Sequence, residues 1–75
     1  MYARNKELEY TLQAWKRMSE RRIAEEQIVS VLENPDTEGQ ARLKGCRRAE
    51  RRLGARTFGV VYREERKTIR IITVW

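Results

Sequence analysis

The sequence predicts an α+β fold, in which two N-terminal helices pack on one face of a three- to four-stranded sheet. Apolar residues recur at helical spacing in the first half of the chain, up to Asn34-Pro35. The second half contains two apolar runs of strand length, Phe58–Tyr62 and Ile69–Trp75. The charged segment between them, Arg63–Lys67, suits the tip of an antiparallel hairpin. Because this segment has no Asn-Gly or Asp-Gly pair, we expect a loop longer than two residues.

The chain length of 75 residues predicts one domain, residues 1–75. A domain of this size buries only about 60% of the surface of its unfolded chain, so its core must be small. The composition, 40% hydrophobic and 37% charged, permits such a core under a charged exterior. Aromatic and β-branched residues cluster in strand-length runs, which favours folding over disorder. Homodimerisation or a bound partner would supplement so small a core.

The first helix is expected to begin after Thr11, whose hydroxyl makes it an acceptable N-cap. The segment just before it, Leu8–Thr11, fits either a short edge strand or the lead-in to this helix. The apolar stripe of the helix consists of three residues at helical spacing, Leu12, Trp15 and Met18. We interpret Trp15 as an anchor in the core.

The second helix is predicted for Glu25–Glu33, after Ile23 plugs the corner between the two helices. Glu25 and Glu26 lie in its first turn, where the helix dipole favours negative charge. Asn34-Pro35 ends it, because the residue before proline is disfavoured in helical conformation. Its buried stripe is expected to be Ile28, Val31 and Leu32. A helix pair this short needs a sheet to cover its apolar stripes.

The basic segment Cys46–Leu53 is predicted as a strand with cations on both faces. One face would carry Cys46, Arg48, Glu50 and Arg52, and the other Arg47, Ala49, Arg51 and Leu53. An earlier strand near Gln40–Lys44 is left open, and Leu53–Arg56 is expected to turn the chain into the core hairpin. The closing strand, Ile69–Trp75, is apolar on both faces apart from Arg70 and Thr73, which indicates a central position in the sheet.

Positive charge is concentrated in the second half of the chain. Residues 40–75 contain 11 Lys/Arg against 3 Asp/Glu, whereas residues 1–39 contain 6 against 8. Such a cluster is usually tolerated because a polyanion or an acidic partner neutralises it. The alternative is that these side chains only solubilise the outer face of the sheet. We expect an anion-binding surface.

The residue types that are missing exclude several kinds of site. The chain has no histidine, which excludes a His-ligated metal, a Ser–His nucleophile and a histidine acid–base pair. Cys46 is the single cysteine and cannot form an intrachain disulfide. We therefore expect no metal and no cofactor. No apolar signal segment and no run of about 20 apolar residues is present, and the expected location is cytoplasmic.

The order of motifs resembles a family of small uncharacterised bacterial domains, over about residues 10–75. The motifs are QAWKRMSERRIAEEQIVSVLENP, the basic strand, GARTFGVVY and TIRIITVW. That family is similar to BrnT and, more distantly, to the RelE/ParE toxins of type II toxin–antitoxin systems. The resemblance implies a RelE/BrnT-like fold whose sheet is twisted and mainly antiparallel. It also implies an RNA-cleaving toxin that is neutralised by an acidic antitoxin.

Two positions depart from the pattern of the family that the chain resembles. Gln13-Ala14 stands where such domains usually have His-Ala, which removes a titratable group that could serve in catalysis. Arg22 stands at the helix corner where they usually have glycine, so strain or a different corner is expected.

A metal-independent endoribonuclease without histidine would depend on arginine and tyrosine, since arginine binds two phosphate oxygens and stays protonated. The predicted catalytic residues are Arg48, Arg52, Arg56 and Tyr62. The predicted nucleic-acid-binding residues are Lys44, Arg47, Arg51 and Arg63. Glu50 would act either as a base or as a neutralising neighbour. The alternative function is a non-catalytic module that binds nucleic acid or an acidic protein through the same basic surface.

Overall fold

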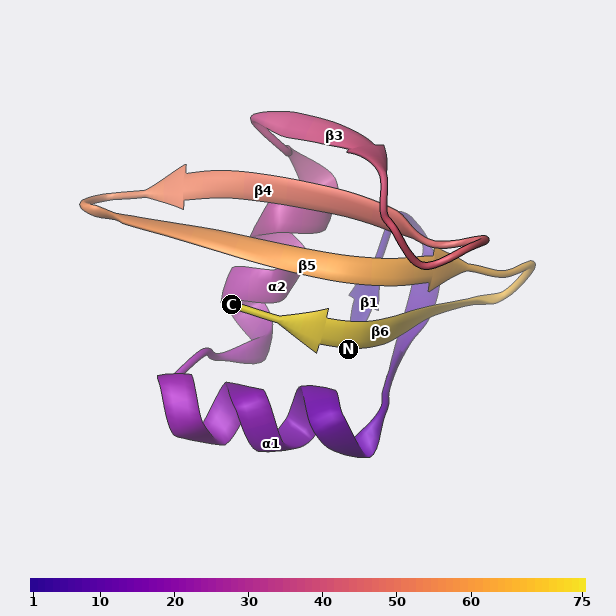
Figure 1. The fold of residues 1–75 in the computed structure, drawn as a ribbon, viewed down its shortest axis with the longest axis horizontal. Helices are drawn as coiled ribbons and strands as arrows, with labels where there is room; N and C mark the ends of the chain where they lie inside the picture. The colour runs from indigo at the N-terminus through magenta and orange to yellow at the C-terminus, as the bar shows by residue number, and fades with distance from the viewer.

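The computed structural model describes all residues, 1–75, as two helices and one six-stranded sheet (Figure 1). In chain order the elements are β1 (Tyr2–Ala3), β2 (Lys6–Tyr10), α1 (Leu12–Arg21), α2 (Glu25–Glu33), β3 (Thr37–Gln40), β4 (Arg47–Leu53), β5 (Arg56–Glu64) and β6 (Thr68–Val74). The strands lie in the order β1-β2-β6-β5-β4-β3. All neighbouring pairs are antiparallel except β2 and β6, which are parallel. The predicted strand number, three to four, is therefore wrong: the sheet has six strands, and two of them precede the helices. The parallel pair makes the sheet mixed, while four of its five strand pairs are antiparallel.

The two additional strands form an N-terminal hairpin with little sequence signal. Its two-residue turn, Arg4-Asn5, has φ angles of 54° and 63°, the left-handed values that a type I′ turn requires. The turn contains no glycine, and on β2 only Leu8 is fully buried, between the exposed Glu7 and Glu9. A polar strand with one buried residue is hard to recognise from periodicity. This strand also lies inside the sheet, between β1 and β6, and is not the edge strand considered from the sequence.

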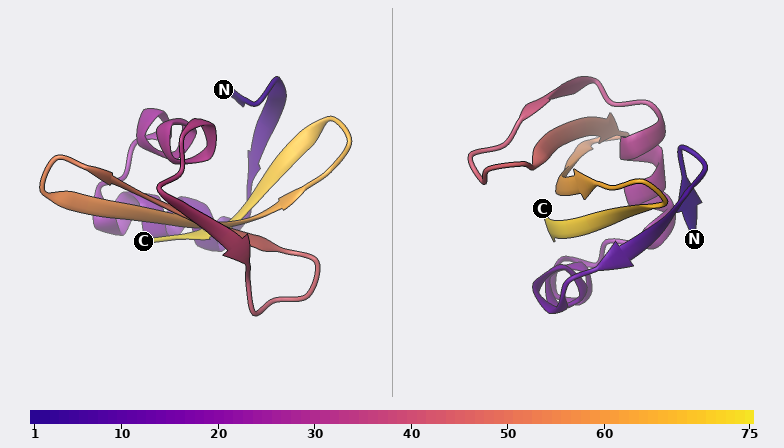
Figure 2. Two further views of the ribbon diagram at one scale, coloured as in Figure 1. Left: turned by 90° about the horizontal axis from the view of Figure 1, so that it is seen from above. Right: turned by 90° about the vertical axis from the view of Figure 1, so that its right-hand side faces the viewer.

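The sheet curls, and the helices occupy different parts of its concave side (Figure 2). Helix α2 packs against β4, β5 and β1, so the curled sheet partly surrounds it. Helix α1 packs against β6 and β2. Both helices thus lie on the same side of the sheet, but the predicted N-terminal helix pair on a small sheet is wrong. The curl separates the two helices and gives each its own set of strands.

Helix α1 begins where the sequence predicts but buries a different side. The Thr11 hydroxyl accepts a hydrogen bond from the Ala14 backbone N–H at 3.1 Å, which confirms the N-cap. Leu12 is 84% exposed and Trp15 49% exposed, so the predicted core roles of these two residues are wrong. Met18 is buried, as predicted, and Ala14 is buried beside it, because its small side chain lets the helix approach the sheet closely. Trp15 stacks against Tyr10, with 4.4 Å between ring centroids.

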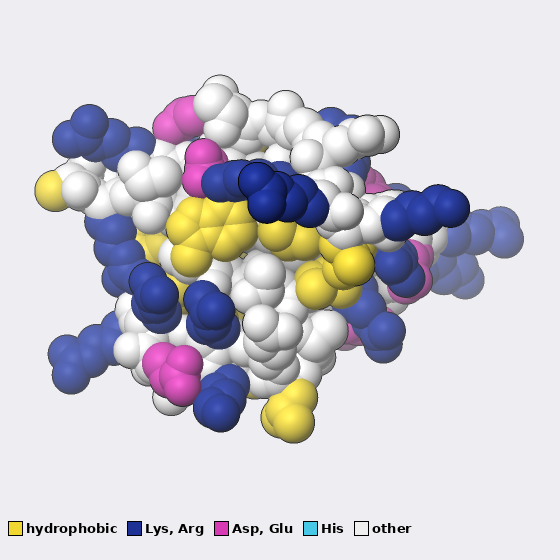
Figure 3. All heavy atoms as spheres, viewed as in Figure 1, with side chains coloured by type: hydrophobic (Ala, Val, Ile, Leu, Met, Phe, Trp, Pro, Cys, Tyr) yellow, Lys and Arg dark blue, Asp and Glu magenta, His cyan; other side chains and the backbone are white.

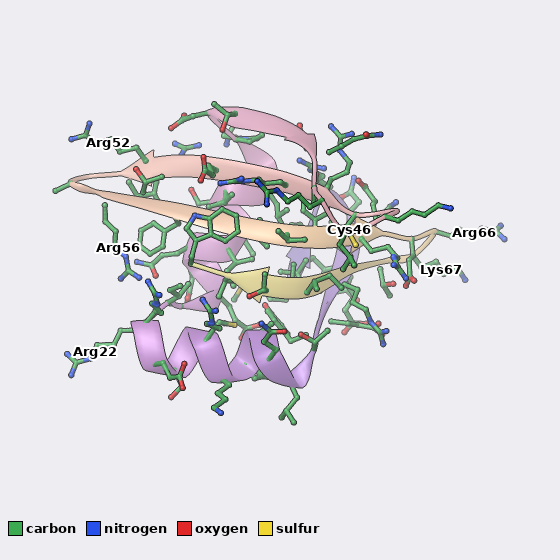
Figure 4. All side chains as sticks on the ribbon, viewed as in Figure 1. Arg22, Cys46, Arg52, Arg56, Arg66 and Lys67 are labelled. Atoms are coloured by element: carbon green, nitrogen blue, oxygen red, sulfur yellow. The ribbon has the colours of Figure 1, made fainter.

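The corner between the helices has the strain expected from Arg22. This residue adopts φ 55° and ψ 52°, the left-handed conformation that glycine accepts most readily. Its backbone N–H reaches the carbonyl oxygens of Met18 and Ser19, and Ile23 is buried behind it, as predicted. Figure 4 shows the Arg22 side chain pointing into solvent at this corner. The predicted second helix, Glu25–Glu33, is confirmed at both ends.

The core lies between the helices and the concave face of the sheet. Tyr62, Ile69 and Ile71 are completely buried there. The predicted central position of the closing strand is confirmed, because β6 lies between β2 and β5. The first strand considered near Gln40–Lys44 is found earlier, at β3, and the following residues form a loop. Neither helix is long and apolar enough to cross a membrane.

Candidate nucleic-acid interface

The sheet has two faces with different roles, and β4 shows them most clearly. We call the concave side that carries the helices the helix face, and the opposite side the outer face. Ala49 is fully buried on the helix face, so Arg48, Glu50 and Arg52, which alternate with it, belong to the outer face. This confirms the alternation predicted for the strand. Figure 1 views the sheet from the outer face, with α2 behind it.

Three of the predicted site arginines, Arg47, Arg51 and Arg56, lie on the helix face, and the last two brace the ends of the helices. Arg51 donates to the carbonyl oxygen of Asn34 at 2.9 Å, just past the end of α2. Arg56 donates to the carbonyl oxygen of Arg21, the last residue of α1, also at 2.9 Å. The Arg56 guanidinium also lies over the Phe58 ring, 4.4 Å from its centroid. Cations at these positions complement the negative ends of the helix dipoles.

Tyr62, a predicted catalytic residue, is fully buried on the helix face in a polar cluster. Its hydroxyl donates to Glu38 on β3. Glu38 also pairs with Arg4 at 2.9 Å and lies 4.0 Å from Arg47. The Arg4 guanidinium lies 5.5 Å from the Tyr62 ring centroid. The cluster therefore connects the β1–β2 turn to β3, β4 and β5.

The pKa values in this cluster keep Tyr62 protonated and Glu38 ionised. Burial, followed by the hydrogen bond to Glu38, raises the pKa of the Tyr62 phenol. The hydrogen bonds from Tyr62 and then Arg4 lower the pKa of the Glu38 carboxyl below its ordinary value. At neutral pH the phenol is therefore a hydrogen-bond donor. The sequence did not point to Arg4 or Glu38, because both are far from Tyr62 in the chain. Arg4 lies in the turn of the unrecognised N-terminal hairpin, and Glu38 lies in β3, which begins before the strand considered near Gln40–Lys44.

The outer face contains a groove that we call the Trp75 groove. Its floor consists of Val61, Ile72 and Thr73, and the end of β3 with the loop that follows it, residues 40–43, forms one side. Arg48 and Trp75 complete the lining, and the volume is about 560 Å³. This is within the range of roughly 300–1,000 Å³ that is usual for small-ligand sites. Figure 3 shows the groove region as an apolar strip crossed by Lys or Arg side chains.

Trp75 is held in place on the outer face by three kinds of contact. Its backbone N–H and carbonyl each bond to Gly59, both at 3.0 Å. A Cβ atom at Gly59 would overlap the Trp75 ring, so glycine lets the indole lie against β5. The indole N–H donates to Glu50 at 3.2 Å, and Glu50 also accepts from Arg48 at 3.0 Å. Arg48 lies over the indole, 4.8 Å from its centroid. Glu50 therefore orients both neighbours.

Further cations extend the outer face beside the groove. Arg63 on β5 and Arg70 on β6 occupy directly paired cross-strand positions and are both exposed. Neither has a carboxylate within ion-pair distance; Arg63 instead donates weakly to the Lys44 carbonyl, at 3.5 Å, and to the sulfur of Cys46. Figure 4 shows Arg66 and Lys67 at the β5–β6 end of the sheet, with Cys46 nearer its middle.

The predicted site residues are consequently divided between the two faces. Arg48, Arg52 and Arg63 lie on the outer face and Lys44 in the loop beside it, whereas Arg47, Arg51, Arg56 and Tyr62 lie on the helix face. The structure thus does not bring the four predicted catalytic residues into one cluster. Sequence reasoning missed Trp75 and Arg70 as surface groups. The sequence signal for Arg70 was a charged residue within the apolar run Ile69–Trp75, whereas the position of Trp75 on the outer face depends on its pairing with Gly59. No group of three or more potential metal ligands is present.

Comparison with known proteins gives one match. Residues 10–75 match the family described as Domain of unknown function (DUF4258), and the chain therefore belongs to this family. The match includes every element from α1 to β6 but excludes β1 and nearly all of β2. No curated protein and no solved structure matches the chain. The resemblance to BrnT and to RelE/ParE toxins consequently stays a prediction.

Proposed function

We propose that this protein binds nucleic acid through the outer face of its sheet. The observation that carries this proposal is the cross-strand pair Arg63–Arg70, which has no carboxylate partner. Like charges directly opposite each other in a sheet are destabilising, and Glu9, the residue in register with Arg70 on β2, makes no ion pair with it, so the free protein tolerates an unfavourable arrangement here. A phosphate group between the two guanidiniums would turn repulsion into attraction, because each can donate two hydrogen bonds to its oxygens.

The surrounding charges support a polyanion as the partner. Arg48 and Arg52 are on the same face, and Arg42 and Lys44 are exposed in the loop beside the groove. Of these cations only Arg48 has a carboxylate partner, Glu50. A polyanion that contacts several of them releases counterions, so its affinity must fall steeply as salt rises.

The test is a titration of labelled RNA with the protein at several salt concentrations. Binding is expected to weaken linearly on a log–log plot against salt. The double variant Arg63→Gln/Arg70→Gln removes the contact to the phosphate between the two guanidiniums and should lower the slope by about 0.7. The control, Lys16→Gln/Arg21→Gln, removes the same charge from exposed positions on α1. If both double variants change the slope equally, only net charge matters and the assignment to the outer face is wrong.

The endoribonuclease activity predicted from the sequence is tested on the same samples. Gel analysis of the RNA after incubation shows whether fragments form, and Arg48→Ala/Arg52→Ala is the variant to compare. Binding without fragments in folded protein would leave the non-catalytic function. A cytoplasmic location, a homodimer and an acidic protein partner also remain proposals. Sedimentation of the purified protein and co-purification of an acidic protein test the last two.

A further inference from the structure

We infer that the Trp75 groove seats one unpaired base, so that the preferred ligand is a single strand and not a duplex. This inference rests on the proposed function and specifies its ligand. The groove has an apolar floor, Val61 and Ile72, and a wall that contains an indole and a guanidinium, Trp75 and Arg48. Bases that are not paired stack on both of these side-chain types. A volume of about 560 Å³ accommodates a base with its sugar.

Trp75 is already in its binding position in the free protein. The backbone bonds to Gly59, the indole bond to Glu50 and the contact with Arg48 hold the ring against the sheet. One face of the indole lies on Gly59 and Arg48 lies over the ring, so an entering base takes the place of the Arg48 guanidinium over the indole, and the fixed ring loses little conformational entropy in this exchange. Trp15, the other tryptophan, stacks only on Tyr10 beside α1 and has no cation over its ring.

The distance between the groove and the arginine pair fits a nucleic-acid strand. Val61 and Arg63 lie two residues apart on the outer face of β5, which places them roughly 7 Å apart. A base in the groove would thus have its neighbouring phosphate near Arg63 and Arg70. In a duplex the flat surfaces of the bases are covered by their neighbours, so a duplex can use only the cations. The charge around the groove also favours this occupant over an apolar peptide.

The experiment uses the Trp15→Phe protein, in which Trp75 is the only tryptophan and reports on the groove. The probes are a 16-nucleotide RNA, a DNA strand of the same sequence, the RNA annealed to its complement, and inorganic polyphosphate. Both single strands are expected to quench Trp75 emission to saturation, since base stacking quenches indole. The duplex and polyphosphate should bind at low salt without this quenching. The RNA and DNA arms show whether the ribose hydroxyl contributes.

A matched pair of variants measures the contribution of the indole. Trp75→Leu is expected to weaken single-strand binding by roughly 5- to 100-fold, the range for loss of one base–aromatic stack. Trp15→Leu removes an equally large side chain from α1 and should leave that affinity unchanged. Gly59→Ala tests the contribution of the indole without removing it. The added Cβ overlaps the ring and displaces it, while every residue of the groove wall is retained.

The outcomes separate this inference from the proposed function. Binding that depends on salt but treats duplex and single strand alike, with no change in Trp75 emission, overturns the base seat and leaves the basic surface intact. The absence of any nucleic-acid binding overturns both. Selective quenching by single strands in the Trp15→Phe protein supports the base seat even if Trp75→Leu fails to fold.

Discussion

The two faces of the sheet use the same residue type, arginine, for different purposes. On the helix face, Arg47 lies near Glu38, and Arg51 and Arg56 donate to carbonyl oxygens at the helix ends. On the outer face, Arg63 and Arg70 face each other without a carboxylate. Because strand residues alternate between faces, adjacent arginines in the sequence meet different partners, and on the outer face Arg48 pairs with Glu50. A cation that has an internal partner stabilises the fold, whereas one without a partner is available to a ligand.

The sharpest test of this comparison is a pair of neighbours on β6. Ile71 is completely buried on the helix face, whereas Ile72 is half-buried in the floor of the Trp75 groove. Ile71→Ala should lower the free energy of unfolding by about 2–5 kcal/mol because it leaves a cavity. Ile72→Ala should lower it by about 1 kcal/mol and weaken single-strand binding. Urea denaturation and binding titrations measure the two effects, and equal destabilisation would contradict the division.

The polar cluster on the helix face predicts an acid-dependent stability. The pKa of Glu38 in the folded protein lies below its ordinary value of 4.5. Its stabilising contribution is therefore fully present above that value and is lost as the pH falls through the lowered pKa. Tyr62→Phe removes the hydrogen bond that contributes most to this shift and should cost about 1.5–3 kcal/mol at neutral pH.

The measurement is the free energy of unfolding from pH 7 down to pH 3, for wild type, Tyr62→Phe and Glu38→Gln. Both variants should show a shallower loss of stability below pH 4.5 than the wild type. An unchanged acid dependence in Glu38→Gln would mean that other carboxylates determine it.

Adjacent arginines on β4 provide a smaller effect of the same kind. Arg51→Ala removes the hydrogen bond to Asn34 and should lower the free energy of unfolding by about 1 kcal/mol, with RNA affinity little changed. Arg52 on the outer face donates to the carbonyl oxygen of Gly54, at 3.0 Å, only two residues along the chain. Because this bond ties together no distant elements, Arg52→Ala should change stability less and should weaken RNA binding at low salt. Denaturation curves and titrations of the two proteins, made side by side, would show the reverse order if the faces were assigned wrongly.

The smallest effect has the opposite sign. Arg63→Gln/Arg70→Gln should raise the stability of the free protein by about 0.2–1 kcal/mol, because a like-charge cross-strand pair is removed. The same variant should bind RNA more weakly. Thermal melting at low salt, where repulsion is largest, is the measurement, and a fall in melting temperature would show that the pair is not repulsive in the fold.

Several local features were predictable because neighbouring residues in the chain decide them. The Thr11 cap and the helix at Glu25–Glu33 follow from capping, the dipole and the proline stop. The strained corner at Arg22 was expected from the resemblance, because such domains usually have glycine there. The alternation along β4 follows from the two-residue period of a strand. Which side of α1 faces the sheet did not follow. The larger apolar residues Leu12 and Trp15 stay exposed, and the smaller Ala14 is buried against the sheet.

By itself, the sequence determined the helices, the strands of the second half and the surplus of positive charge there, since these depend on local spacing and composition. Only the tertiary structure decided that β2 joins β6 in parallel and that the sheet curls around α2. It also decided which arginines have partners, because Arg51 meets Asn34 and Arg56 meets Arg21 across long stretches of chain. The Trp75 groove has the same origin: contacts between Gly59, Glu50 and Trp75 depend on strand pairing, which no local pattern specifies.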